Sequence, residues 1–165
     1  MTTQQIIITL LAYAIVLAAA VYFTKPSRRR IAGAAAGGAA AGLVGLGAAT
    51  LGNAQGWWRV PLPSTFGILA LLYICCVVSW MPFLLITWRV ALRFGGRGVA
   101  ICLMVATFAG PLRDYLTAAV FPEWIVFGPG FLPVLFDAAA FFSMLGVGHA
   151  IMQLAAGPAR SEQRR

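Results

Sequence analysis

The sequence predicts an all-α membrane protein, a bundle of five transmembrane helices. Of its 165 residues, 61% are hydrophobic and only 10% are charged, and the mean hydropathy is +0.89. A soluble domain carries roughly 25% charged residues. Five apolar runs are each long enough to cross a bilayer, which takes about 20 residues of helix. Nearly all the basic residues fall in short clusters between these runs, as they do in membrane loops.

The five apolar runs define the expected spans in chain order. They lie near 4–24, 31–52, 66–88, 99–120 and 133–156. Helix is expected in each because an open sheet leaves backbone groups unpaired in lipid, and the alternation typical of a barrel is absent. The first run precedes its basic residues, the reverse of a signal peptide, so we expect it to be retained. The connections are short, which predicts one membrane domain over 1–157 and a flexible basic cytoplasmic tail over 158–165.

The basic residues predict the orientation of the spans. Segments 25–30, 89–97 and 160–165 hold ten of the twelve basic residues. Basic loops stay in the cytoplasm, so we expect the N-terminus outside, the C-terminus inside and contact with anionic lipids at the cytoplasmic face. Trp57, Trp58 and Trp124 fall at outer span ends, where aromatic side chains anchor a protein in the interface. We expect an integral protein of the cell membrane, and the arginine-, alanine- and glycine-rich composition hints at the bacterial inner membrane.

The second span is expected to be a helix-packing surface. Its glycines recur at spacings typical of one helix face. Close approach of helices through small residues drives association in lipid. The face consists of Gly33, Gly37, Gly38, Gly42, Gly45 and Gly52. The sequence leaves open whether this glycine zipper packs within the monomer, in a self-associated oligomer or against another membrane protein.

Two charges stand inside the fourth span, at Arg113 and Asp114. A charge at the centre of a spanning helix costs roughly 2.5–3.5 kcal/mol on insertion scales, so such residues usually have a partner. Neighbours in sequence do not face each other on a helix. Asp137, in the fifth span, is expected at a similar depth, and consecutive spans usually pack side by side. We therefore predict an Arg113–Asp137 ion pair, with Asp114 beside Arg59, Tyr115 or water.

The outward-facing polar spot is the best candidate for a ligand site. It comprises Arg59, Arg113, Asp114, Tyr115 and Asp137. Two interpretations remain open: a pocket that holds a polar headgroup, an ion or a proton, and a structural salt bridge with charges that reach toward the interface. Pro82 and Pro111 predict kinks in the third and fourth spans, because proline cannot donate a backbone hydrogen bond.

Other chemistry finds little support in the sequence. Clustered loop charges argue against nucleic-acid binding. Cys75, Cys76 and Cys102 lie in apolar runs without metal-ligand spacing, and His149 is the single histidine. We therefore expect no metal site and no cofactor. No motif identifies a family.

Three classes of function survive. The first is a non-enzymatic subunit or helix-packing partner of a membrane complex, which we favour. The second is an oligomeric transporter or channel protomer, suggested by kinked spans and charges at membrane depth. The third is a membrane enzyme acting on a lipid or isoprenoid, with Asp114, Glu123 or Asp137 as acid or base. A filled salt bridge would favour the first, a water-filled path past His149 the second, and an apolar tunnel ending at the carboxylates the third.

Overall fold

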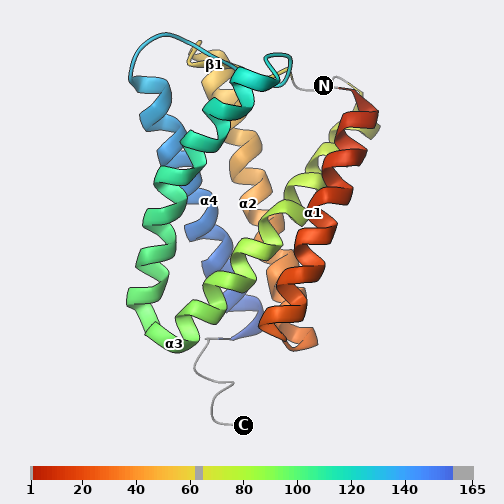
Figure 1. The fold of residues 1–165 in the computed structure, drawn as a ribbon, viewed down its shortest axis with the longest axis vertical. Helices are drawn as coiled ribbons and strands as arrows, with labels where there is room; N and C mark the ends of the chain where they lie inside the picture. The colour runs from red at the N-terminus through yellow and green to blue at the C-terminus, as the bar shows by residue number, and fades with distance from the viewer. Residues whose placement is uncertain (1, 62–64, 158–165) are drawn as a thin grey trace.

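The protein folds as an all-helical bundle, shown in Figure 1. The structure is a computed structural model that describes residues 2–61 and 65–157; the expected tail 158–165 lies outside them. Four helices in this part of the chain are long and apolar enough to cross a membrane. In chain order the elements are α1 (Thr3–Thr24), α2 (Arg28–Ala54), β1 (Trp58–Arg59), α3 (Phe66–Val120), β2 (Val126–Phe127) and α4 (Leu132–Ala156).

Helix α3 covers two of the predicted spans and the connection between them. The predicted loop at 89–97 is wrong, because the helix continues through its three arginines. The interior residue with non-helical dihedral angles is Gly95, at φ 61° and ψ −144°, a conformation that glycine adopts without steric cost. The chain reverses there, and two arms, 66–94 and 96–120, diverge from the turn (Figure 1). The dihedral angles stay helical at Pro82 and Pro111.

The two ends of the bundle differ in character. At one end, β1 pairs antiparallel with β2, with Trp58 opposite Phe127 and Arg59 opposite Val126. We call this the strand end. At the opposite end lie the end of α1, the start of α2, the Gly95 turn and the end of α4 (Figure 1). We call it the basic end, since Lys25, 28–30 and the arginines around Gly95 lie there.

Local capping explains why α2 begins earlier than the apolar run. The side chain of Ser27 accepts a hydrogen bond from the Arg30 backbone amide at 3.3 Å, and the helix starts at Arg28. The same amide also donates to the Ser27 carbonyl at 2.9 Å, and serine is a favoured N-cap residue because its side chain accepts from first-turn amides. The three arginines therefore form the first turn of a helix, and Arg30 is fully buried.

The core lies where α2, α3 and α4 meet. Large side chains from α3 and α4 fill it, including Trp80, Leu84, Phe141 and Met144. Helix α1 packs against α3, next to the first arm in Figure 1. It leaves most of its apolar side chains exposed, which suits contact with lipid.

The glycines of α2 face other elements of the same chain. A Cβ at Gly37 would overlap the carbonyl oxygen of Gly148 in α4, and one at Gly38 would lie 2.7 Å from the carbonyl oxygen of Val77 in α3. The remaining members meet Met152 and Ala156 (Gly33), Tyr73 (Gly42), Met144 (Gly45) and Trp58 (Gly52). Five of these glycines thus let α2 approach α3 and α4, and Gly52 makes room for an indole ring. The face is used inside the monomer.

Candidate functional site: two cavities that meet at Arg113

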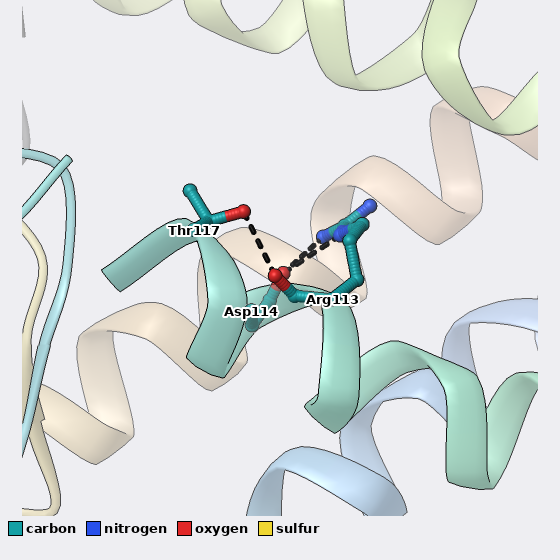
Figure 2. A network of polar contacts seen from close by, with 3 residues as sticks. All are labelled: Arg113, Asp114 and Thr117. Atoms are coloured by element: carbon teal, nitrogen blue, oxygen red, sulfur yellow. Dashed lines mark hydrogen bonds and ion pairs between the residues drawn. The ribbon is translucent and has the colours of Figure 1, made fainter. Parts of the chain in front are cut away.

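The second arm of α3 carries an ion pair near the strand end. Arg113 donates from Nε at 2.8 Å and from Nη2 at 2.5 Å to Oδ1 of Asp114 (Figure 2). Thr117, one turn further on, donates to the backbone carbonyl of Arg113 at 2.8 Å. The predicted Arg113–Asp137 pair is therefore wrong. The arginine side chain is long and flexible enough to reach the next residue, although the Cβ atoms of the two residues point in different directions.

Arg113 also reaches α4, but through an aromatic ring. Its guanidinium carbon lies 5.0 Å from the centre of the Phe141 ring. This contact is possible because Gly110, one turn earlier, has no side chain: a Cβ there would overlap the same ring. A guanidinium over an aromatic face is a favourable cation–π arrangement. Gly110 and Phe141 thus set the position of the guanidinium.

Asp137 lies on α4 and is only 5% exposed. None of the residues that the structure describes supplies a hydrogen bond to its Oδ2. A buried acceptor without a donor is costly, and nearly all such groups in proteins have a partner. Within the described residues, Asp137 thus has a carboxylate oxygen that could still accept a hydrogen bond.

Arg113, Asp114 and Asp137 line one cavity of about 290 Å³ toward the strand end. Its walls come from α1, α2, both arms of α3 and α4, and Trp58 of β1 also contributes. Among the lining residues are the hydroxyl-bearing Thr9, Tyr13 and Ser79. We call this space the polar cavity. It has the size and the few convergent polar groups that are typical of small-molecule sites.

A second cavity, of about 350 Å³, lies between the two arms of α3 and α4. Its walls are almost entirely apolar, and Arg113 is the charged residue among them. Four lining side chains are between 46% and 60% exposed, so the space opens at the bundle surface: Phe83, Ile86, Ile101 and Val105. We call it the apolar cavity. It adjoins the polar cavity, since Ser79, Trp80, Arg113 and Phe141 line both.

The other expected members of the polar spot lie elsewhere. Arg59 is exposed on β1. The ring of Tyr115 is stacked on Phe127 at 3.9 Å. Glu123 accepts a hydrogen bond from Gln5 at 3.2 Å, which ties the start of α1 to the segment before β2. The three carboxylates considered as acid or base are therefore not assembled, and only Asp114 and Asp137 share a cavity.

The tryptophans expected as anchors lie around the strand end. Trp57 and Trp58 pack on Phe136 of α4, with ring centres 4.5 and 5.3 Å away. The Trp124 ring is stacked on Phe121. Trp58 is buried and lines the polar cavity, so it is a packing residue as well as a candidate anchor.

A second polar cluster occupies the basic end. Arg30 donates from Nη1 to the carbonyl of Gly157 at 2.9 Å and lies over the Trp88 ring. His149 is buried and its Nε2 lies 2.7 Å from Gln153 Nε2. Neither His149 nor Gln153 lines the cavities at Arg113. The cluster joins α2, α3 and α4 at this end.

Sequence reasoning missed two parts of the site. Tyr13 and Trp80 belong to the cavity walls, but in the sequence they look like ordinary residues of apolar spans. The apolar cavity itself depends on the angle between the two arms of α3. The small residues Ala106, Ala109 and Gly110 on one wall were the available signal, because they leave space beside Arg113.

Searches against protein-family models, curated protein sequences and solved structures find no match.

Proposed function

We propose that this chain is a five-span protein of the bacterial inner membrane, with its strand end outside and its basic end in the cytoplasm. The length of α3 supports the count: its 55 residues would measure about 80 Å if straight, against a hydrocarbon core of about 30 Å. Two crossings joined at Gly95 resolve this mismatch. The arginines at the basic end support the orientation and suit contact with anionic lipids.

The orientation predicts opposite labelling of Arg29 and Arg59. Both side chains are exposed, one at the basic end and one at the strand end. In a chain with Cys75, Cys76 and Cys102 replaced, Arg59→Cys should react with an impermeant maleimide added to intact cells, and Arg29→Cys only after the cells are opened. Labelling of both from the same side would overturn the orientation.

Within this topology, we propose that the protein binds a lipid with a long apolar chain. The apolar part occupies the apolar cavity and the polar end lies beside Arg113, Asp114 and Asp137. The observation that carries this proposal is the junction of the two cavities at Arg113. An apolar space that opens at the bundle surface and adjoins a cavity with a buried carboxylate, Asp137, suits an amphiphile better than an ion or a water path.

Filling the apolar cavity tests this function. Ala106→Phe places a ring in the cavity and should lower the amount of lipid that remains bound after purification in mild detergent by about tenfold, a loss of about 1.4 kcal/mol in binding. Native mass spectrometry of the intact protein measures this amount. Ala109→Phe, at the same wall, serves if the first variant does not fold.

Ala119→Phe is the matched control. Ala119 is exposed on the same arm and does not line either cavity at Arg113. This variant should retain the bound lipid. If wild-type protein carries no lipid at all, or if the cavity variants and Ala119→Phe retain equal amounts, the lipid-binding function is wrong.

A role as a subunit of a membrane complex is the second candidate. The glycine face no longer supports it, because α3, α4 and Trp58 cover those glycines in the monomer. Helix α1 offers another contact surface, with Ile8, Leu11 and Ile15 each more than half exposed. The same native spectra decide: a stable complex with a second protein, or an oligomer, without bound lipid would favour the subunit role. An oligomeric transporter would need a polar path from the polar cavity past His149.

A further inference from the structure

The polar cavity contains more than an anchoring charge, and its composition restricts what the lipid's polar end can be. The inference below rests on the lipid-binding function proposed above. We infer that the bound lipid ends in a hydroxyl group, a long-chain or isoprenoid alcohol, whose hydroxyl donates a hydrogen bond to Asp137.

The charges in the cavity argue against an anionic headgroup. The lining residues carry one cation, Arg113, and two carboxylates, Asp114 and Asp137. The charge of Arg113 is already met by Asp114 in direct contact, through two hydrogen bonds to the same oxygen. When Asp137 is ionised, a carboxylate or phosphate entering the cavity would meet an excess of negative charge. Like charges placed together in a site oppose binding.

The carboxyl group of Asp137 favours a ligand that donates a hydrogen bond. Asp137 is 5% exposed and lines the cavity, and the described chain leaves its Oδ2 without a hydrogen bond. A ligand donor that reaches this oxygen removes the cost of the buried acceptor. A hydroxyl group both donates and accepts, so it bonds to Asp137 whether or not the carboxyl carries a proton. An ammonium group only donates and requires the ionised form.

The surroundings of Asp137 suit a hydroxyl end followed by an apolar chain. Tyr13, from α1, brings a phenol to the same cavity. Ser79 donates to the carbonyl of Cys76 at 2.8 Å, which leaves its oxygen able to accept. Ser79 lies at the border with the apolar cavity, where the chain of the lipid would begin. The polar cavity thus suits the hydroxyl end of an alcohol, and the adjoining apolar cavity suits its chain.

A matched set of probes tests the inference. Oleyl alcohol, oleic acid, oleylamine and cis-9-octadecene share an 18-carbon chain with one cis double bond and differ at one end. Each is added to delipidated full-length protein in mild detergent, and binding is measured by native mass spectrometry and by the shift in the thermal unfolding midpoint. Oleyl alcohol should bind roughly tenfold more tightly than cis-9-octadecene, the effect expected of one hydrogen bond to a buried carboxyl. Oleic acid should bind no better than the hydrocarbon.

Variants assign the effect to Asp137. Asp137→Leu removes the acceptor and should reduce the affinity for oleyl alcohol to the affinity for cis-9-octadecene. If that variant does not fold, Asp137→Asn keeps an acceptor but removes one negative charge, and should narrow the difference between alcohol and acid. Glu123→Gln, at a carboxylate outside both cavities, is the control and should leave all four affinities unchanged.

The outcomes separate this inference from the function on which it rests. If all four probes bind equally and Ala106→Phe blocks their binding, the lipid-binding function is supported but the role of Asp137 is wrong. A preference for oleic acid would also overturn it and would identify Arg113 as the recognising group. Tighter binding of oleylamine than of the alcohol would show that the site takes a cation. If no probe binds, the lipid-binding function fails as well.

Discussion

Gly37→Val is expected to disrupt the bundle. A Cβ at this position would overlap the carbonyl oxygen of Gly148 and lie 2.9 Å from Leu84 Cδ1, which is fully buried. The backbones of α2 and α4 therefore have to separate, and backbone atoms cannot move aside as a flexible side chain can. Overpacking a core costs typically about 1–3 kcal/mol, and a backbone clash belongs at or above the upper end. We expect a large fall in the thermal unfolding midpoint in detergent and much less folded protein in the membrane.

Gly47→Val is the matched control for this substitution. Gly47 lies on the same helix, and no atom lies within 4 Å of the Cβ that would be added. The same change of side chain should leave the midpoint near the wild-type value, because it points into open space. Equal destabilisation by the two substitutions would show that α2 does not approach α4 through Gly37.

Trp58→Ala is expected to have the second large effect. The indole is 6% exposed, donates from Nε1 to the Ala49 carbonyl at 3.2 Å and packs on Phe136 and Phe127. Its ring also fills the space beside Gly52. Truncating a buried tryptophan to alanine costs about 3–5 kcal/mol. Loss of this ring should lower the free energy of unfolding, measured by denaturation in detergent, by an amount in that range.

Trp58→Phe and Phe66→Ala complete the comparison. The phenylalanine keeps most of the apolar contact and loses the hydrogen bond, so it should recover more than half of the lost stability. Phe66 is 84% exposed near the same end of the molecule, and its truncation should leave the stability nearly unchanged. If Trp58→Ala is as harmless as Phe66→Ala, then Trp58 is an interfacial anchor and not a packing residue.

The helices of this protein follow from hydropathy, but the way α3 turns does not. The apolar runs locate α1, α2 and α4 to within a few residues of their ends, and the runs 66–88 and 99–120 both fall within α3. The run 89–97 reads as a loop because it holds three arginines and two adjacent glycines. The structure keeps it helical and concentrates the reversal in Gly95. Charged side chains at a membrane surface are compatible with helix, so charge alone marks depth and not the end of a helix.

Depth within the site could be predicted, whereas rotation around the helix axes could not. Counting residues from the span ends placed Arg113 and Asp137 at similar depth, and both line the polar cavity. The predicted bond between them required the angular position of two helices, which depends on Gly110 and Phe141 in the packed bundle. The β1–β2 pair was also missed, because two-residue strands in loops 68 positions apart leave no periodic signal.

The buried Arg30 shows a similar limit of local reasoning. The sequence predicts a cytoplasmic loop at this residue. Its side chain is instead fully buried and donates to the carbonyl of Gly157, the residue that directly follows α4. This acceptor lies 127 residues away in the sequence and is close to Arg30 only because α4 ends at the same end of the bundle. A cation at a helix C-terminus interacts favourably with the helix dipole.

In the five-span topology that we propose, the turn at Gly95 has a consequence for how the protein would enter the membrane. With a single residue to reverse the chain, the two arms of α3 have no slack between them, so neither can settle in the bilayer while the other waits in water. We therefore expect them to enter together as a helical hairpin. In that topology the arginines on both sides of the turn would stay on the cytoplasmic side, and this one insertion step would fix the direction of two of the five proposed spans.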